Sequence, residues 1–387
     1  MSNFPRLQKA LSRQGIHVSF RDGIYNIHNA HAAASILLPA ALPLEQKAVT
    51  QLLEFASVAD PQGQGAVCKA CATPDFHPGS IAPVGAVVAT SRDFVIPAAI
   101  GTDINCGIRI MRTGLNLAQA EAHKSSIIAK LKRAILENGR DVPVRSAGFK
   151  ALFDDGPASF LEQLPELGLW RAADRDQLQR ELAACVGLDS FQGDARYGPE
   201  ALMQSREIVR PPSAAELGGG NHFLEFNVVD EIFDRHAAYE AGLKKGDITV
   251  MIHTGSRDVG FYVGRRWMDL AKQAWPQGLK HPSHGLYGLS GHLAAEYMKA
   301  MGVAARYAWF NRMALGEIVR QQLADIAAPD ASAVIVDVPH NVVLQEDEFN
   351  VHRKGSTPAH DGQWALIPGS MGDHSYLVKG LGHEDWL

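Results

Sequence analysis

An acidic and a sulfur side chain lie three residues apart in the segment Asp103-Ile-Asn-Cys106. In a turn, a carboxylate and a thiolate at this spacing can reach one point. A hard oxygen and a soft sulfur, completed by imidazoles, suit a catalytic divalent ion such as Mn²⁺, Zn²⁺ or Co²⁺. A structural zinc site would instead add a second pair of cysteines nearby. The segment therefore indicates a catalytic metal site.

Three histidines that are distant in the sequence are the candidate partners of this segment. His222, His253 and His340 each stand at one boundary of a strand-like apolar run. A single histidine at a strand end is more often structural, but strand ends are rigid and the loops beyond them are open. Five ligands exceed one tetrahedral site. We therefore predict two ions that share Cys106 as a bridge, an arrangement suited to phosphoryl chemistry.

Loops next to these histidines carry groups that bind phosphate. The glycines of Gly218-Gly-Gly-Asn-His222 let backbone amides approach an anion. His253-Thr-Gly-Ser-Arg257 adds hydroxyls and a guanidinium, which grips phosphate as a planar fork. An ordinary polar turn is the alternative for both. It is the favoured interpretation of the Gly/Ser loop 368–375 taken alone, and Arg353-Lys354 fits a phosphate contact or a solvated turn equally well.

Composition excludes several classes of protein. Lys and Arg number 37 against 42 Asp and Glu, a net charge of −5, which argues against coating nucleic acid through bulk charge. No P-loop motif occurs, and no Gly-x-Gly-x-x-Gly follows a strand, so the usual nucleotide-binding folds are disfavoured. The N-terminus has no signal-peptide pattern and no apolar stretch is long enough to cross a bilayer. We expect a cytoplasmic protein without membrane contact.

The number of cysteines also fits a cytoplasmic protein. Four cysteines in 387 residues are typical of a reduced, cytosolic protein. Cys68 and Cys71 form a Cys-x-x-Cys pair, but neither a second pair nor a thioredoxin-like context accompanies it. We therefore expect ordinary thiols there.

The irregular order of strand-like and helix-like runs and the many Gly-rich turns predict a mixed α+β fold, with largely antiparallel sheets and covering helices. We divide the chain into an N-terminal preface, 1–58, and a catalytic domain, 59–387, that carries a helical insertion at about 114–212. The segment 60–80 is rich in Gly and Pro and is expected to be a loop. Strands are expected at 24–27, 34–38, 84–90, 93–99, 107–113, 222–229, 248–252 and 333–338. Helices are expected at 44–57, 116–137, 157–167, 174–187, 263–275 and 290–326.

From about residue 70 onward the chain resembles the RtcB family of RNA ligases. So many motifs in one order are a far more specific signal than any one of them. The residues that carry the resemblance are Pro74-Asp-Phe-His-Pro-Gly79, Pro83-Val-Gly85, Ile100-Gly-Thr-Asp-Ile-Asn-Cys-Gly107, Gly220-Asn-His-Phe-Leu-Glu225, His253-Thr-Gly-Ser-Arg257, His340-Asn341, Arg353-Lys-Gly355, Pro368-Gly-Ser-Met-Gly372 and Gly380-Leu-Gly382.

The resemblance implies a GTP- and Mn²⁺-dependent ligase. Such enzymes join an RNA 3′-phosphate or 2′,3′-cyclic phosphate end to a 5′-hydroxyl end, as in RNA repair and tRNA splicing. A histidine takes GMP from GTP and passes it to the RNA 3′-phosphate, and the 5′-hydroxyl then displaces GMP. A helper protein of the archease type is a further partner by analogy.

Carried over by motif, the resemblance implies three sets of site residues. Asn221 and Arg257 would hold the RNA or nucleotide phosphate as catalytic residues. The metal ligands would be Asp103, Cys106, His222, His253 and His340. The guanine nucleotide would lie against Asn221, His222, Phe223, Leu224, Glu225, His340, Asn341, Pro368, Gly369, Ser370, Met371 and Ser375.

The family's guanylylated histidine would follow the segment 380–387 within a few residues, so we expect the C-terminal segment that carries it to be missing here. His383 also stands where the family usually has Asn. Three interpretations remain: a shortened chain, a natural short chain that keeps a phosphoesterase reaction, or replacement of the nucleophile by His374 or His383. A two-metal phosphoesterase or nuclease that needs no GTP is therefore the alternative enzyme. A non-catalytic module that binds metal and RNA ends is the third hypothesis.

Overall fold

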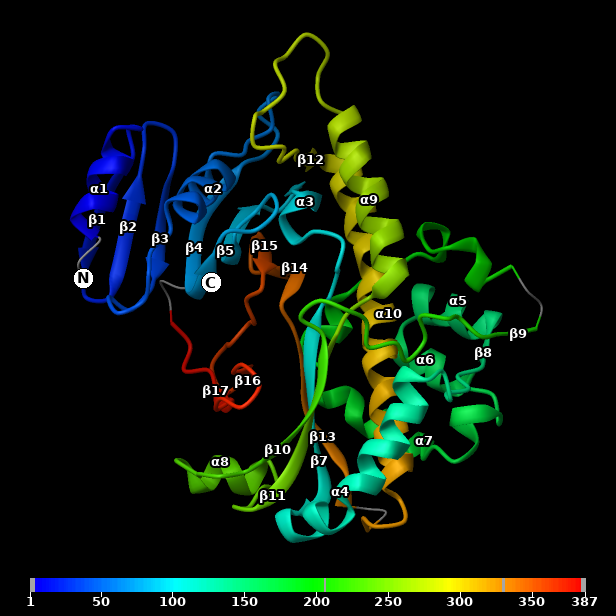
Figure 1. Ribbon diagram of the computed structural model, residues 1–387. Helices are drawn as coiled ribbons and strands as arrows, with labels where there is room; N and C mark the ends of the chain where they lie inside the picture. Colours follow the sequence, from blue (N-terminus) through cyan, green and yellow to red (C-terminus); the bar gives the residue numbers. More distant parts are fainter. Residues whose placement is uncertain (1–3, 205–206, 329–330, 384–387) are drawn as a thin grey trace.

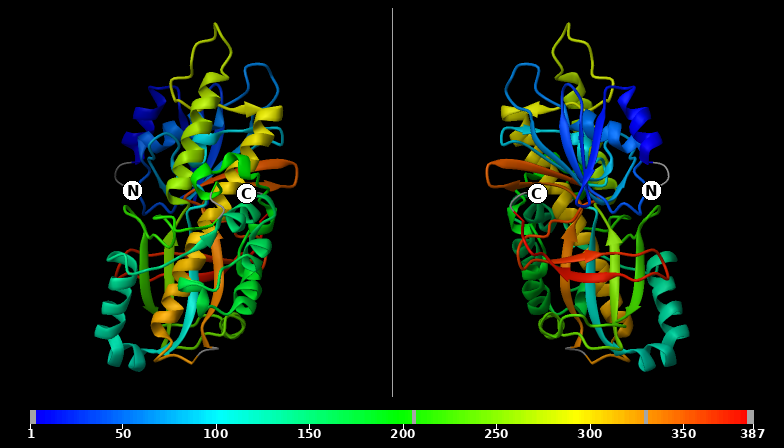
Figure 2. Two further views of the ribbon diagram at one scale, coloured as in Figure 1. Left: turned by 90° about the vertical axis from the view of Figure 1, so that its right-hand side faces the viewer. Right: turned by 90° about the vertical axis from the view of Figure 1, so that its left-hand side faces the viewer.

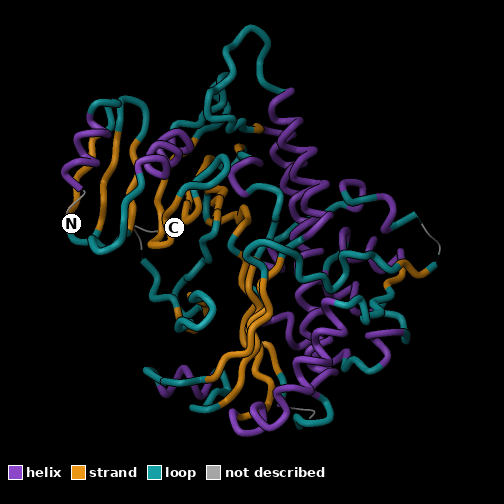
Figure 3. Tube along the Cα trace, in the orientation of Figure 1, coloured by secondary structure: helices purple, strands orange, loops and turns teal. Residues whose placement is uncertain are grey.

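The computed structural model describes residues 4–204, 207–328 and 331–383. Residues 384–387, the end of the C-terminal motif, lie outside the described residues. The described chain forms a mixed α+β fold with one seven-stranded and one four-stranded sheet, and helices cover both (Figures 1 and 3). This confirms the predicted fold class. Within the described ranges, no helix combines the length and apolar character needed to cross a bilayer.

The seven-stranded sheet has the order β1-β2-β3-β4-β5-β15-β14 and is antiparallel except between β3 and β4. Helices α1 (Phe4–Ser12) and α2 (Gln46–Ala56) share its apolar cluster. The first three strands extend the sheet of the following segment, and a domain boundary at residue 58 stays a prediction. The strands are β1 (His17–Arg21), β2 (Ile24–His28), β3 (Ala33–Leu37), β4 (Val67–His77), β5 (Val84–Ser91), β14 (Asn341–Glu346) and β15 (Phe349–Lys354).

Strand β4 corrects the expected loop at 60–80. Its residues 70–72 are buried between β3 and β5, and the prolines and glycines misled the sequence interpretation. Pro74 lies where the pairing with β5 shifts register between Ala72 and His77. A proline is tolerated there, because a bulged residue donates no hydrogen bond to the ladder.

The four-stranded sheet has the order β10-β11-β7-β13 and is antiparallel throughout. Helix α10 (Gly291–Leu323) covers one face, and the hairpin of β16 (Trp364–Ile367) and β17 (Tyr376–Lys379) covers the other (Figure 2). Alternate residues along each strand therefore enter different apolar clusters. The strands are β7 (Gly107–Asn116), β10 (Phe223–Val228), β11 (Asp247–Thr254) and β13 (Ala333–Pro339).

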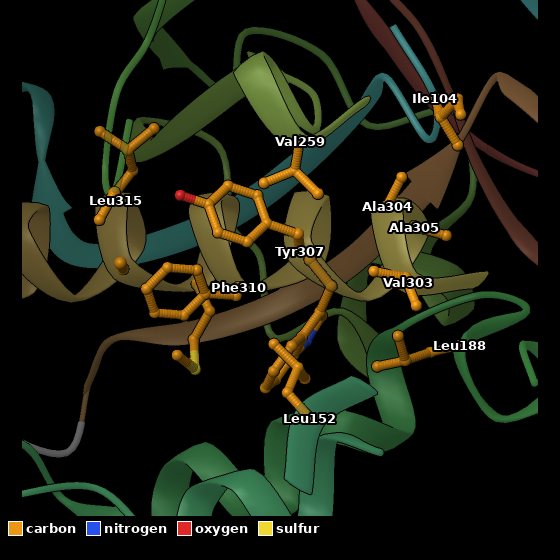
Figure 4. Close-up of a cluster of buried hydrophobic side chains, with 14 of the residues drawn as sticks. Ile104, Leu152, Leu188, Val259, Val303, Ala304, Ala305, Tyr307, Phe310 and Leu315 are labelled. Atoms are coloured by element: carbon orange, nitrogen blue, oxygen red, sulfur yellow. The ribbon is translucent and has the colours of Figure 1, made fainter. Parts of the chain in front are cut away.

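Helix α10 is the centre of the larger core. Tyr307 and Phe310 pack against each other with ring centroids 5.4 Å apart, and the Tyr307 hydroxyl reaches Ser213 Oγ at 2.7 Å. Figure 4 shows Ile104 near Ala305 at one end of this cluster. Ile104 is fully buried. The turn between the two predicted ligands is therefore anchored in the core by the residue it encloses.

The helical segment between β7 and β10 lies around α10 on the right of Figure 1. A capping box starts α4, in which Asn116 accepts from the Gln119 amide while the Gln119 side chain accepts from the Asn116 amide. The elements are α4 (Leu117–Leu131), η1 (Lys132–Leu136), β8 (Val144–Arg145), α5 (Ser146–Asp154), α6 (Pro157–Glu162), η2 (Gly168–Arg171), α7 (Arg175–Arg180), η3 (Glu181–Ala184), η4 (Leu188–Ser190), η5 (Ala195–Tyr197), η6 (Glu200–Leu202) and β9 (Ile208–Val209).

Short elements complete the fold and correct one expectation. The run 93–99 is not one strand, since β6 contains only Phe94–Val95 and helix α3 (Pro97–Ile100) follows. Pro97 starts that helix, where its fixed φ favours helix and no amide hydrogen is missed. The remaining elements are α8 (Arg235–Glu240), α9 (Arg257–Gln273) and β12 (Leu289–Ser290).

A buried ion network joins α10 to the four-stranded sheet. The Asp337 carboxylate of β13 accepts from Arg109 Nε and Arg312 Nε, each at 2.8 Å, and all three side chains are about 2% exposed or less. Burial would raise the pKa of Asp337, but the two guanidinium groups hold it below its usual value. The carboxylate is thus charged and fully paired inside the protein.

We expect Asp337→Asn to lower the free energy of unfolding by about 3–5 kcal/mol, because it leaves two buried cations without their counterion. The pKa of Asp337 is depressed on folding, so its contribution is present above the unfolded value of about 3.9 and is lost as pH falls below it. Urea unfolding between pH 3 and pH 7 checks both effects. A variant as stable as the parent chain would contradict this account of the network.

Candidate metal centre

Five side chains from four segments converge at one end of the four-stranded sheet. Cys106 Sγ lies 3.1 Å from His253 Nε2 and 3.3 Å from His222 Nε2. His222 Nε2 also lies 2.8 Å from Asp103 Oδ2, and His253 Nε2 lies 3.1 Å from His340 Nε2. The ligand atoms form two groups, Asp103–Cys106–His222 and Cys106–His253–His340, each within 4.8 Å. Cys106 belongs to both, as the bridge hypothesis expects.

The segment of Asp103 and Cys106 is a closed turn. The Cys106 amide donates to the Asp103 carbonyl at 3.1 Å. Asn105 adopts a left-handed conformation with φ of 53°, which asparagine tolerates better than most residues. Gly255 gives the carboxylate room, since a Cβ there would lie 2.3 Å from Asp103 Oδ1. The turn therefore fixes the carboxylate and the thiol together.

Strand pairing brings the histidines to this turn. His253, in β11, pairs with Ile108 of β7 on one side and with Phe223 of β10 on the other. His222 immediately precedes β10. His340 lies between β13 and β14, and its amide donates to the Cys106 carbonyl at 2.8 Å. The predicted positions of all three histidines at strand boundaries are confirmed.

Hydrogen bonding prepares His222 to act as a ligand. Its Nδ1 lies 3.0 Å from the Leu217 carbonyl oxygen, which can only accept. Nε2 faces Asp103 and Cys106, and an ion bound there would replace the hydrogen that Nε2 shares with Asp103, while Nδ1 would keep its bond to the Leu217 carbonyl. Arg257 lies beside this ring and donates through Nε to Glu216 Oε2 at 3.2 Å. The predicted phosphate-binding guanidinium thus lies next to the candidate metal centre.

Electrostatics in this cluster favour a bound cation. Burial would raise the pKa of Asp103, but its hydrogen bond with His222 lowers it to about 2. Burial, with the Asp103 charge, raises the pKa of the Cys106 thiol well above its usual value. Burial, with the neighbouring His222, lowers the pKa of His253 to about 4, and burial also lowers that of His340. Coordination to a divalent ion would lower the pKa of the Cys106 thiol, because the metal binds the deprotonated thiolate.

The donor set fits two divalent ions. Ligand bonds of about 2.0–2.3 Å around one ion separate the ligand atoms by roughly 3–4 Å. The measured contacts of 2.8–3.3 Å are slightly shorter than this, and a small outward movement of the side chains would admit an ion. Two imidazole nitrogens 3.1 Å apart can share at most one hydrogen, so their lone pairs are better used on a cation. The residues present therefore fit the predicted pair of ions.

The predicted nucleotide-binding residues of β10 lie on different faces. Asn221 is exposed beside the glycine loop, and the Phe223 ring contacts the His253 ring with centroids 5.3 Å apart. Glu225 shares the face of Phe223, because it lies two residues further along the strand. Leu224 points to the opposite face, where it lines an apolar groove beside α4. Leu224 is therefore turned away from the candidate metal centre.

The other predicted nucleotide-binding residues fall into two groups. Asn341 is buried and supports the metal turn, since its amide donates to the Asp103 carbonyl at 3.3 Å. By contrast, 368–371 form an exposed loop after β16, with Met371 93% exposed. Ser375 Oγ closes this loop by accepting from the Gly369 amide at 2.9 Å. His340 is already part of the ligand cluster.

The sequence suggested that Arg353-Lys354 is either a phosphate contact or a solvated turn. Both interpretations are wrong for Arg353. Its side chain is 1% exposed and forms a two-pronged ion pair with Glu346, so it is neither a solvated turn nor free to bind phosphate. Lys354 Nζ donates to the Ile100 carbonyl at 3.1 Å, directly before the glycine that leads into the metal turn.

The two candidate substitute nucleophiles lie outside the ligand clusters found in the described residues. His374 is exposed in the loop after β16. His383 is exposed and borders a groove beside Cys68 and Cys71 of β4. Both of these cysteines are free thiols, as expected.

Sequence reasoning missed the residues that support the cluster from α10. Asn311 and Arg312 are fully buried and bond to the backbone of the ligand-bearing segments. A signal was available, because an amide and a guanidinium interrupt the apolar pattern of the helix predicted at 290–326. Such an interruption marks a buried polar network.

Comparison with known proteins gives the family. The family model for tRNA-splicing ligase RtcB matches residues 51–387. A protein named tRNA-splicing ligase RtcB from Archaeoglobus fulgidus is 30% identical over 367 residues, covering 87% of this chain and 73% of that protein. Proteins of the same name from Thermococcus kodakarensis and Pyrobaculum aerophilum are each 31% identical, covering 79% of this chain and 68% of their own length.

The fold and the site define a mixed α+β protein with a candidate two-ion metal centre at the ends of its strands. The chain belongs to the RtcB family. The resemblance drawn from the ordered motifs is thereby confirmed.

We expect Cys106→Ala to abolish binding of both ions, because Sγ belongs to both groups of ligands. Cys106→Ser is the matched control, since it keeps a small polar side chain but replaces the soft thiolate with a weak ligand. Titration with Co²⁺, followed by thiolate-to-metal absorbance and by metal analysis, checks this. Two ions retained by Cys106→Ala would contradict a shared thiolate.

Proposed function

We propose that this protein is an RNA ligase that joins a 3′-phosphate or 2′,3′-cyclic phosphate end to a 5′-hydroxyl end with GTP and two Mn²⁺ ions. Membership of a family whose named relatives are tRNA-splicing ligases supports the class of reaction. The observation that carries the proposal is the position of Cys106 between two groups of ligands. Zn²⁺ and Co²⁺ are possible substitutes for Mn²⁺.

The proposed metal ligands are Asp103 and His222 for one ion, His253 and His340 for the other, and Cys106 for both. Bound there, the ions would supply charge that activates a phosphate oxygen and neutralises a polyphosphate. The chain's own contribution is rigidity. The closed turn and the strand pairs hold the five donors so that little reorganisation accompanies the reaction.

Arg257 and Asn221 are the proposed phosphate contacts. The Arg257 guanidinium lies beside His222 and pairs with Glu216, which is 41% exposed. An incoming phosphate can replace part of this pair with a two-pronged bond. Asn221 is exposed next to the glycine loop and offers an amide donor. These residues would hold an RNA end against the metal centre.

GTP would lie between β10 and the exposed loop 368–371. Phe223 contributes an aromatic face beside the metal centre, and the loop contributes backbone amides and Ser370. Transfer of GMP to RNA would proceed through a nucleophile on the protein. Among the described histidines outside the ligand clusters, His374 and His383 are the candidates that the sequence singled out, and the experiment below tests them.

A two-metal phosphoesterase or nuclease is the second candidate. It is favoured by one observation: the two groups of ligands are complete within the described residues, without a further histidine. Such an enzyme would open a cyclic phosphate without GTP. Dependence on GTP separates the two proposals.

The cellular setting is part of the proposal. Four free cysteines, one of them a proposed ligand, suit the reducing cytoplasm. A helper of the archease type is carried over by analogy alone. We also propose that residues 1–58 form a preface to the catalytic domain and that about 114–212 are a helical insertion within it.

We expect Gly218→Ala to weaken RNA-end binding by roughly 10- to 100-fold, about the loss of one charge-assisted hydrogen bond. A Cβ at Gly218 would lie 2.3 Å from Arg257 Cζ, so the guanidinium must move. Gly220→Ala is the control, since Gly218 and Gly220 both have a positive φ but nothing lies within 4 Å of the Cβ position of Gly220. Binding of a 3′-phosphorylated oligonucleotide checks both. Equal losses in both variants would refute the role of Arg257.

The decisive test of function combines intact-protein mass with an RNA joining assay. The protein is incubated with Mn²⁺ and GTP, and then with RNA fragments that carry 2′,3′-cyclic phosphate and 5′-hydroxyl ends. A gain of one GMP and a joined product are expected, and peptide mapping then identifies the modified histidine. Opening of the cyclic phosphate without GTP would favour the phosphoesterase. Metal and RNA binding without turnover would leave a binding module.

A further inference from the structure

Two adjacent residues of α10 bond to the metal turn, to the end of β11 that carries His253, and to Glu216 and Asp337, which come before His222 and His340 in the chain. Arg312 Nη1 donates to the Asn105 carbonyl at 2.7 Å and to the Thr254 carbonyl at 3.0 Å. Its Nε donates to Asp337 Oδ1 at 2.8 Å. One guanidinium therefore ties together the metal turn, the end of β11 and strand β13.

Asn311 binds the remaining segment. Its Nδ2 donates to the Glu216 carbonyl at 2.9 Å and to the Gly255 carbonyl at 3.2 Å, and its Oδ1 accepts from the Glu216 amide at 2.9 Å. The next residue, Leu217, provides the carbonyl that orients the ring of His222. The Asn311 side chain thus joins the segment before His222 to Thr254 and Gly255, which follow His253.

We propose that Asn311 and Arg312 are positioning residues that set the geometry of the metal centre through the backbone, without contacting an ion. This inference rests on the proposed metal centre. Three features support it. Both residues are 1% exposed or less, both are fixed on a 33-residue helix packed through the core, and three of their partners, Asn105, Thr254 and Gly255, lie within two residues of Cys106 or His253.

The chemistry of the side chains explains why they are suited to this task. A guanidinium spreads five donors over a rigid plane, so Arg312 Nη1 reaches two carbonyls while its Nε reaches the carboxylate, whereas the three donors of an ammonium group all lie on one atom. An amide offers a donor and an acceptor, as the Glu216 backbone requires. Loss of groups that orient metal ligands typically weakens metal binding by about 10- to 100-fold.

Helix α10 also offers a matched control. Arg306 is buried and donates to three carbonyls, those of Leu152, Phe153 and Phe191, at 2.6–3.2 Å. These carbonyls lie in the helical segment and none of them is adjacent to a proposed ligand. Arg306→Lys should therefore destabilise the fold in a similar way to Arg312→Lys while leaving the metal centre intact.

The experiment measures binding of Co²⁺ to the full chain by calorimetry and by its visible spectrum, with thermal unfolding of each metal-free variant. We expect Arg312→Lys to weaken binding of both equivalents by at least tenfold and to alter the spectrum. Arg306→Lys should bind and absorb like the parent chain, although it unfolds at about the same temperature as Arg312→Lys. Asn311→Ala should also weaken binding, because it loosens the segment before His222 and the pair of residues after His253.

Each outcome decides the inference. If Arg312→Lys binds Co²⁺ like the parent chain, or if Arg306→Lys loses binding equally, the positioning role is wrong while the metal centre stands. If the parent chain binds no divalent ion, the metal centre fails and the inference fails with it. If Arg312→Lys does not fold, Asn311→Ala decides, and parent-like binding by that variant overturns the proposal.

Discussion

The convergence of one carboxylate, one thiol and three imidazoles on a single point is the constraint on which this structure depends. These groups repel or exclude one another unless protons or cations lie between them. The Cys106 thiol is at the middle, within 3.3 Å of two imidazole nitrogens. Holding such a cluster requires that the backbone of four segments be fixed before any ion binds, since flexible ligands would otherwise move apart.

The surrounding fold supplies that rigidity through strand pairing, a closed turn and a buried ion network. Antiparallel pairing sets His253 beside Phe223 and aligns the start of β7 with the end of β13. The turn that precedes β7 is closed by its own hydrogen bond and anchored by Ile104 in the core. Beneath it, the paired charges of Asp337, Arg109 and Arg312 lock helix to sheet. Arg257 lies beside the His222 ring, next to the glycine loop.

The sequence predicted much of this arrangement, because the chemistry was concentrated in short motifs. The spacing of Asp103 and Cys106 indicated a turn, and the apolar runs beside the histidines indicated strands. What could not be predicted depended on long-range contacts. The proline in β4 made this segment resemble a loop, and only its pairing with β3 and β5 defines it as a strand. The burial of Arg353 depends on its pairing with Glu346 in the neighbouring strand, which a charge in the sequence does not reveal.

In the candidate site, too, the sequence identified some residues, and only three-dimensional contacts identify the others. The candidate ligands were recognisable by residue type, whereas the proposed positioning residues, Asn311 and Arg312, are identified only by the contacts they make. The two faces of β10 likewise separate Phe223 from Leu224, although the motif contains both.

The proposal that the Cys106 thiolate is shared by two ions can be tested directly. Electron paramagnetic resonance of the chain loaded with two equivalents of Mn²⁺ should give the spectrum of an exchange-coupled pair, as expected for ions about 3.5–4 Å apart. A spectrum of isolated Mn²⁺ ions at full occupancy would contradict the shared thiolate.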